Sequence, residues 1–143
     1  MNRCLLVLLC ACFIGAEQTR SPEVLEVPQL FRGWAVIVWD VAGYPALPKD
    51  GAKLVERLPN DGILITSTHL ESGVAADELY LIDDFGNRVA NPSKVMKHHG
   101  TVAVLGSGNQ AVHLTAFFIG TPAEAKAVSV DSKISEALRK AKP

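Results

Sequence analysis

Short runs of β-branched and aromatic residues, each bounded by Gly, Pro, Asp or Asn, dominate the chain from residue 33 to residue 120. Such runs favour extended backbone, and the residues that bound them favour turns. The pattern predicts a mainly β domain, either a small antiparallel β-sandwich or a barrel, with about seven short strands and a C-terminal helix. The expected strands cover residues 33–40, 53–58, 63–68, 78–82, 88–90, 101–105 and 111–119.

Turn residues indicate which of these strands pair as hairpins. Asp61-Gly62 lies between two short runs, and this dipeptide is a strong hairpin signal because Gly adopts the unusual dihedral angles of a tight turn. It predicts that residues 53–58 pair with residues 63–68. The turn at residues 83–87 predicts a second hairpin, and residues 106–110 a third.

The first sixteen residues, MNRCLLVLLCACFIGA, have the composition of a secretion signal. Arg3 gives a positive start, residues 4–14 are apolar, and Gly15-Ala16 supplies small residues before a cleavage point. The apolar run is shorter than the roughly 20 residues of a transmembrane helix. The alternative is a buried N-terminal strand or helix. We expect an exported protein that is periplasmic, anchored to the membrane as a lipoprotein, or secreted.

Two processing routes fit this segment. One is cleavage after Ala16, and the other is lipidation of Cys12, because Leu9-Cys10-Ala11-Cys12 resembles a bacterial lipobox. All three cysteines lie in the segment, so the mature domain is expected to have no disulfide and to depend on its hydrophobic core. The 14 basic and 15 acidic residues form no basic cluster, which argues against a nucleic-acid partner. Membrane contact is expected only through a lipid anchor at Cys12.

The mature chain divides into three parts. Residues 17–32 are polar and contain Pro22 and Pro28, which predicts a tether; residues 33–120 form the β-rich domain, and residues 121–143 a helical tail. Thr121-Pro122-Ala123-Glu124 has the form of a capping box. Apolar residues recur every three or four positions as far as Ala141, and Asp131 is a candidate start for a second helix. Because half of this stripe is alanine, we expect the tail to dock weakly, on its own domain or on a partner.

No catalytic or metal-binding motif stands out, so we expect no catalytic residue, metal or cofactor. Ser107 lies in a glycine-rich loop between strands, not in the strand–turn–helix setting of a hydrolase nucleophile. The histidines lack the spacings of known metal motifs. A small envelope hydrolase and a histidine-based metal-binding protein are the alternatives to a non-catalytic domain. The four histidines are His69, His98, His99 and His113.

Three aromatic residues are candidates for binding. Trp34 and Trp39 are separated by an odd number of positions, so they face opposite sides of a regular strand. We expect one to be buried and the other to lie nearer the surface, where it would form a recognition patch with Tyr44. The alternative is that both faces of the strand are buried.

Several motifs occur in a familiar order: Gly33-Trp34-x-Val36-Ile37-Val38-x-Asp40, Pro45-x-Leu47-Pro48-x-x-Gly51, Pro59-x-Asp61-Gly62-Ile63-Leu64-x-Thr66-Ser67, Asp77-Glu78-x-Tyr80, His99-Gly100 and Phe117-Phe118-Ile119-Gly120-Thr121. Over about residues 33–121 the chain resembles a family of small exported bacterial proteins, many of them lipoproteins, catalogued as domain of unknown function 6843. This resemblance implies an exported, β-rich protein and implies no activity. The run from Val38 to Leu47 is also similar to the opening of transthyretin-like or carboxypeptidase-regulatory-like sandwich modules, which implies a non-catalytic binding or spacer domain.

These observations lead to one main hypothesis. The chain is expected to be an exported, non-catalytic β-sandwich domain that binds a protein partner or a small ligand in the cell envelope.

Overall fold

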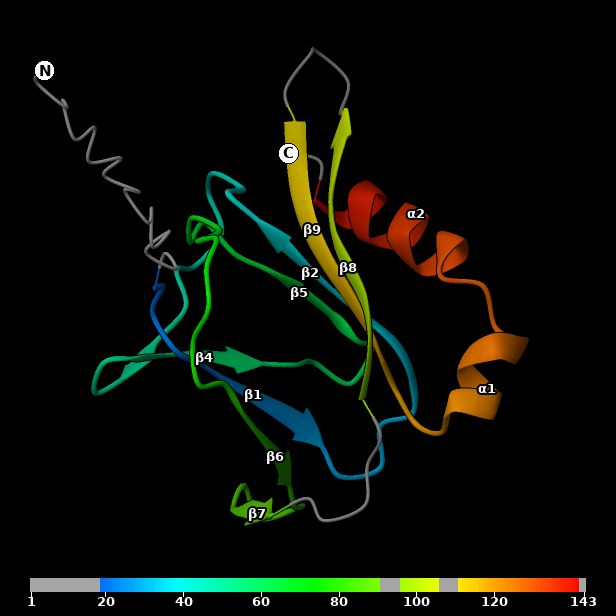
Figure 1. Ribbon diagram of the computed structural model, residues 1–143, viewed down its shortest axis with the longest axis horizontal. Coiled ribbons are helices and arrows are strands. Elements are labelled where there is room, and N and C mark those ends of the chain that lie inside the picture. Colours follow the sequence, from blue (N-terminus) through cyan, green and yellow to red (C-terminus); the bar gives the residue numbers. More distant parts are fainter. Residues whose placement is uncertain (1–18, 91–95, 106–110, 142–143) are drawn as a thin grey trace, which may run out of the picture.

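The computed structural model describes residues 19–90, 96–105 and 111–141, which form two β-sheets followed by two helices (Figure 1). The first sheet has the strand order β3-β4-β1-β6-β7, and the second has the order β5-β2-β9-β8. The first sheet consists of β1 (Glu23–Pro28), β3 (Lys49–Asp50), β4 (Lys53–Arg57), β6 (Glu78–Ile82) and β7 (Arg88–Ala90). The second sheet consists of β2 (Gly33–Trp39), β5 (Ile63–Ile65), β8 (Met96–Leu105) and β9 (Ala111–Ile119). The helices are α1 (Pro122–Ala127) and α2 (Asp131–Lys140).

The prediction of a mainly β sandwich with a C-terminal helical region is confirmed, and the two sheets do not close into a barrel. The pairing is not purely antiparallel. β1 runs parallel to both of its neighbours, β4 and β6, and β2 runs parallel to β5. Hairpin-type antiparallel pairing joins β6 to β7 and β8 to β9, as the turn residues predicted.

The expectation of a tether over residues 17–32 is wrong for residues 23–28, which form the central strand of the first sheet. In β1, Val24 and Val27 are fully buried and Leu25 is 6% exposed. Glu23 and Glu26 interrupt these apolar residues three positions apart, and their charges hid the strand in the sequence. Apolar residues occupy both faces of this strand, because the sheet is buried on both of its faces at β1.

The Asp61-Gly62 turn forms, but the strands on either side of it do not pair. The amide of Gly62 donates to the carbonyl of Pro59 at 2.9 Å, as in a tight turn. The turn then carries the chain from β4 in the first sheet to β5 in the second, where β5 pairs with β2. The predicted hairpin is therefore wrong, because a turn signal fixes a local reversal and not the sheet that the next strand joins.

The space between the sheets holds one of two hydrophobic cores. Inward-facing residues of β1 and β4 meet inward-facing residues of β2 and β9 across it. Its buried members are Leu25, Val27, Ala35, Ile37, Trp39, Leu47, Leu54, Leu58, Phe117 and Ile119.

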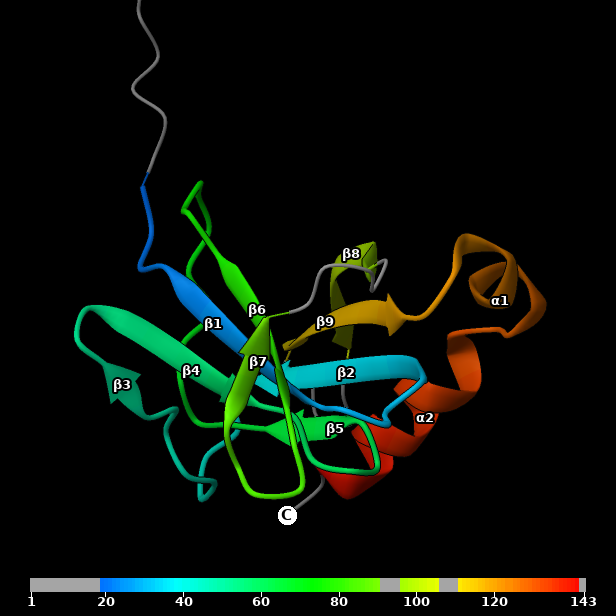
Figure 2. The same ribbon diagram turned by 90° about the horizontal axis from the view of Figure 1, so that it is seen from below.

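The second core lies on the opposite face of the four-stranded sheet, where the two helices cover β2 and β9 (Figure 2). Trp34 and Phe118 pack edge to face there, with ring centroids 5.3 Å apart. Ala125 and Ala137 press against this face and are 5% and 0% exposed. The small alanine side chains let the helices approach large aromatic residues closely, so the alanine stripe forms part of a core and the expected weak docking is not what the structure shows.

The capping box at the start of the tail is confirmed. Thr121 Oγ1 accepts a hydrogen bond from the Glu124 amide, and the Glu124 carboxylate accepts one from the Thr121 amide at 2.6 Å. α1 ends at Ala127 and α2 begins at Asp131, so the tail is broken at the place where the sequence indicated a second start.

Several sequence predictions fall outside the described residues. These concern the secretion signal, cleavage after Ala16, lipidation of Cys12, and Ser107. Among the helices that the structure does describe, none is long and apolar enough to cross a membrane.

Candidate ligand-binding cavity

A cavity of about 470 Å³ opens between the two sheets, beside the segment that precedes β1. This volume lies within the range of roughly 300–1,000 Å³ typical of small-molecule sites. One part of its wall is apolar and is formed by Leu25, Ile37, Trp39, Leu70, Leu79 and Phe117. The polar part is formed by Arg20, Glu23, Glu56, Glu71, Ser72, Gly73, Asp77, Glu78 and Thr115.

Glu56 is the most unusual residue of the wall. It lies on β4 between Leu54 and Leu58, and because alternate residues of a strand share a face, all three point between the sheets. Glu56 is 5% exposed, yet among the described residues its carboxyl group has no hydrogen-bond or ion-pair partner. Among the described residues, no fully buried side-chain nitrogen or oxygen lacks a partner, so the carboxyl oxygens of Glu56 are accessible from the cavity, where water or a ligand can bond to them.

Burial raises the pKa of Glu56 to about 8. The carboxylates of Glu23 and Asp77 raise it further, because a second negative charge nearby disfavours ionisation, while Arg20 lowers it. Burial, opposed by Arg20, likewise raises the pKa of Glu23 above its ordinary value. Near neutral pH the Glu56 carboxyl group of the free protein is therefore mostly protonated.

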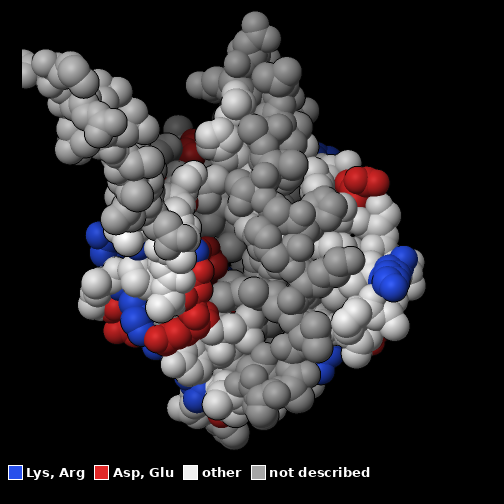
Figure 3. Space-filling view, in the orientation of Figure 1, with Lys and Arg blue, Asp and Glu red and all other residues white. Residues whose placement is uncertain are grey.

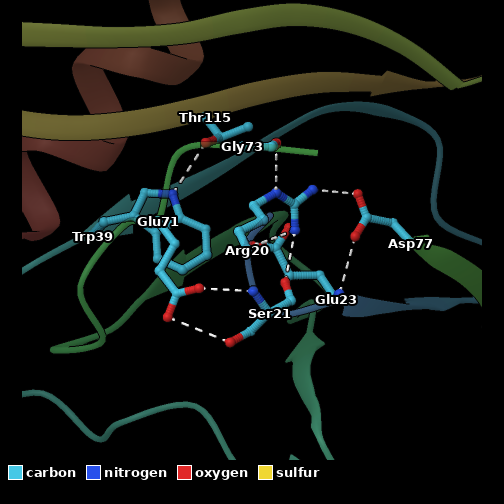
Figure 4. Close-up of polar contacts among 8 residues, drawn as sticks. All are labelled: Arg20, Ser21, Glu23, Trp39, Glu71, Gly73, Asp77 and Thr115. Carbon is cyan, nitrogen blue, oxygen red and sulfur yellow. Dashed lines mark hydrogen bonds and ion pairs between the residues drawn. The ribbon is translucent and has the colours of Figure 1, made fainter. Parts of the chain in front are cut away.

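Arg20 organises the mouth of the cavity (Figure 4). Its Nε donates to the carbonyl of Gly73 at 3.2 Å, one terminal nitrogen contacts Glu23 at 3.2 Å, and the other pairs with Asp77. Asp77 also accepts a hydrogen bond from the Glu23 amide at 3.0 Å. These bonds tie the segment before β1 to the segment before β6 and leave every guanidinium nitrogen of Arg20 engaged.

Acidic groups outnumber basic ones around the cavity. Glu71 adds a further carboxylate at the mouth, where it accepts a hydrogen bond from the Ser21 amide at 2.8 Å. Figure 3 shows Asp and Glu side chains gathered on the side of the molecule that carries β1 and β4, with Lys and Arg at the margin. The cavity therefore combines an apolar wall with a negative electrostatic potential.

The three aromatic residues predicted to bind a partner lie in two places. Trp39 lines the cavity, where its indole nitrogen donates to Thr115 Oγ1 at 3.1 Å. Trp34 lies on the opposite face, and the Tyr44 hydroxyl donates to the Lys140 carbonyl at the end of α2. The opposite-face prediction is confirmed, but neither tryptophan lies near the surface, since Trp34 is 7% and Trp39 2% exposed.

Two of the four histidines meet at one carboxylate outside the cavity. His69 Nδ1 lies 2.7 Å from Asp40 Oδ1, and His113 Nδ1 lies 3.6 Å from Asp40 Oδ2. His98 pairs in register with Phe117, four residues along β9 from His113 and hence roughly 13 Å away along the strand. Within the described part of the chain, no group of three or more His, Cys, Asp or Glu residues is arranged to hold a metal ion.

Sequence reasoning missed the two residues that define the cavity, Glu56 and Arg20. A signal for Glu56 is present in the sequence, because a charged residue alternates with Leu54 and Leu58 on the apolar side of a strand. No comparable signal exists for Arg20, whose role depends on loops that meet only in the folded chain.

Two packed sheets, a helical cover and an acidic cavity with an apolar wall define a β-sandwich domain with room for a small molecule. The chain belongs to the DUF6843 family, a family of unknown function whose model matches residues 19–128. Its fold is similar to the 2.75 Å crystal structure of a protein described as a lipoprotein from Bacillus anthracis. The TM-score is 0.73 at 18% identity, over 85% of this chain and 94% of that one. Comparison with curated proteins gives no match.

Proposed function

We propose that the chain is an exported, non-catalytic domain of the cell envelope that binds a small ligand in the cavity between its two sheets. The observation that carries the proposal is the Glu56 carboxyl group, which is buried, points into the cavity and has no partner among the described residues. The carboxyl oxygens are accessible from the cavity, so a ligand donor can replace water there and bond to a group that the protein itself leaves unpaired.

The composition of the wall supports binding in preference to catalysis. Small-molecule sites are mostly apolar, with a few polar groups that orient the ligand. Of the polar residues of this wall, Glu56 has no partner among the described residues, whereas each guanidinium nitrogen of Arg20 is bonded to a neighbour. His69 and His113, the two histidines whose side chains the structure describes, contact the carboxylate of Asp40, whereas a Ser-His or Thr-His nucleophile requires a histidine bonded to a hydroxyl group.

Export is supported by the N-terminal sequence and by the fold. Residues 1–16 have the composition of a secretion signal, and the structurally similar protein from Bacillus anthracis is described as a lipoprotein. Cleavage after Ala16 would release a soluble domain, whereas lipidation of Cys12 would leave a short linker between the membrane and residue 19. Palmitate labelling that is lost in Cys12→Ser would establish the second route.

The two tryptophans allow a direct test of cavity binding. Their indole N–H signals are separate reporters in a ¹⁵N-labelled protein, one on each face of β2, and Trp34→Phe assigns them. A fragment set with cationic, neutral and anionic members is expected to contain compounds that shift the Trp39 indole and the amides of β1 and β4, with the Trp34 indole unchanged. A set in which no compound shifts the Trp39 indole would contradict the proposal.

A further inference from the structure

We propose that the ligand of this cavity is an organic cation with N–H donors on an apolar body, and that Glu56 is its counter-charge. This inference rests on the proposed binding function and names the chemical class that the cavity recognises.

The charge of the wall selects against anions. Five acidic residues line the cavity, and Arg20 is the one basic residue among the described residues that do so. Arg20 donates to the carbonyls of Gly73 and Ser21 and pairs with Glu23 and Asp77, so its positive charge is already balanced by carboxylates of the protein. Glu78 is neutralised by Lys53 on the outer face of the sheet. The remaining carboxyl groups give the cavity its negative potential.

The apolar wall requires more than a small inorganic cation. Leu25, Ile37 and Phe117 are buried members of the core between the sheets, and they also line the cavity. A ligand that fills this space must bury hydrocarbon against them, which stabilises binding by about 25 cal/mol per Å² of apolar area. The Trp39 ring adds a face on which a cation is favoured. The fit is to a cationic group attached to an aliphatic or aromatic body.

Glu56 requires that the cation carry N–H groups. Its carboxylate oxygens are acceptors, and among the described residues none of the protein's own donors reaches them. A primary ammonium or a guanidinium group can donate to both oxygens in a charge-assisted pair, which is about twice as strong as a neutral hydrogen bond. A quaternary ammonium group has no N–H and cannot form this pair.

Binding of such a cation is linked to a proton. Burial raises the pKa of Glu56 to about 8, with a further contribution from Glu23 and Asp77 and an opposing one from Arg20. Glu56 is therefore mostly protonated in the free protein at neutral pH. An ammonium ligand favours the carboxylate form, so the carboxyl proton leaves to solvent as the ligand binds. Affinity should then rise between pH 6 and 8, with a limiting slope of about tenfold per pH unit for one released proton.

The test uses four probes that share a body and differ in the charge or the N–H groups of the head: 3-phenylpropylamine, 3-phenylpropanol, 4-phenylbutyrate and 3-phenylpropyltrimethylammonium. Each is titrated into the protein in its exported form, with the Trp39 indole signal as readout. We expect the amine to bind at least tenfold more tightly than the alcohol or the quaternary ammonium, and the carboxylate to bind most weakly. Calorimetry in buffers of different ionisation enthalpy should show release of close to one proton.

Glu56→Gln is the decisive variant, because Gln keeps the shape of the side chain and cannot ionise. It should remove the preference for the amine over the alcohol and abolish proton release. Glu136→Gln, on α2, makes the same substitution away from the cavity and should leave both unchanged. The pH series on the unchanged protein needs no variant, so the inference is tested even if Glu56→Gln folds poorly.

The outcomes separate this inference from the binding function. If the alcohol or the carboxylate binds at the Trp39 face as tightly as the amine, the cavity binds ligands and the cationic class is wrong. If the quaternary ammonium equals the amine, the pairing with Glu56 is wrong. If none of the four probes binds, the inference is overturned, and the fragment screen decides separately whether the cavity binds small molecules at all.

Discussion

The indole nitrogen of Trp34 donates a hydrogen bond of 2.8 Å to the backbone carbonyl of Val128, across 94 positions of the sequence. This bond joins β2 to the link between α1 and α2. The aromatic face of the four-stranded sheet is covered by the same two helices, so the C-terminal segment completes a core. A domain boundary at residue 121 would cut through that core.

Ala137 tests the fit of α2 against the sheet. Its side chain is fully buried, so Ala137→Leu forces extra volume into a packed interface and should lower the free energy of unfolding by about 1–3 kcal/mol. Ala127→Leu is the matched control, because Ala127 is an exposed helical alanine and its substitution should change stability by less than about 0.5 kcal/mol. Urea denaturation measures both. Equal effects would mean that α2 does not pack as the structure shows.

Gly62 tests the crossover between the sheets. It has a φ of +75°, and a Cβ atom placed there would lie 2.7 Å from the Phe31 ring. Gly86 has a similar φ of +84° but has open space around it, so Gly86→Ala should cost only the left-handed backbone penalty of about 1–2 kcal/mol. Gly62→Ala should cost that amount and about 1–3 kcal/mol more for the clash. Thermal denaturation of the two variants measures the difference, which arises from the contact between the new Cβ atom and the Phe31 ring. Equal losses of stability would show that the Phe31 ring moves aside freely.

The sequence predicted local structure better than it predicted which elements meet. The capping box at Thr121, the break before Asp131 and the turn at Asp83–Asn87 were found because each depends on neighbouring residues. β1 was missed because its glutamates look solvent-exposed, although Glu26 is held by Arg57 and Arg88, which come from strands far along the chain. The cavity was missed for the same reason, since Arg20 contacts residues more than 50 positions away.

Glu26 tests the charge network on the outer face of the first sheet. Its side chain is 4% exposed and accepts hydrogen bonds of 2.7 Å from Arg57 and from Arg88. Glu26→Gln at pH 7 should lower the free energy of unfolding by about 2 kcal/mol, because charge-assisted bonds are lost and two arginines lose their partner. Asp84→Asn, in an exposed turn, is the control and should be close to neutral.

The effect of Glu26→Gln should depend on pH in a defined direction. Burial raises the pKa of Glu26, but the hydrogen bonds from the two arginines outweigh it and hold the pKa below the ordinary value of 4.5. The unfolded chain therefore takes up this proton first, so the stabilisation is present above pH 4.5 and is lost as the pH falls below it. Urea midpoints at pH 7 and pH 3 should show the gap between the two proteins narrowing. A gap that stays constant would place the effect in packing and not in charge.

Glu56 should give the opposite pH dependence. Its pKa is about 8 in the folded protein and 4.5 in the unfolded chain, so between these values the folded protein binds more protons than the unfolded one. Stability then falls as the pH rises from about 4.5 to about 8, by up to about 1.4 kcal/mol per pH unit from this group. Glu26 adds nothing to the slope in this range, because it is ionised in both states.

Glu56→Gln should remove this pH dependence of stability without leaving a void, since a protonated glutamic acid and a glutamine have the same shape. At pH 5 the two proteins should have nearly the same free energy of unfolding. By pH 8.5 the variant should be the more stable by a few kcal/mol, roughly the product of the pKa shift and 1.4 kcal/mol. Burial, opposed by Arg20, also raises the pKa of Glu23, so the variant keeps a slope of the same sign from that group. Urea denaturation in half-unit steps from pH 5 to 8.5 measures both curves, and parallel curves would mean that Glu56 ionises freely and is not held in a buried, unpaired state.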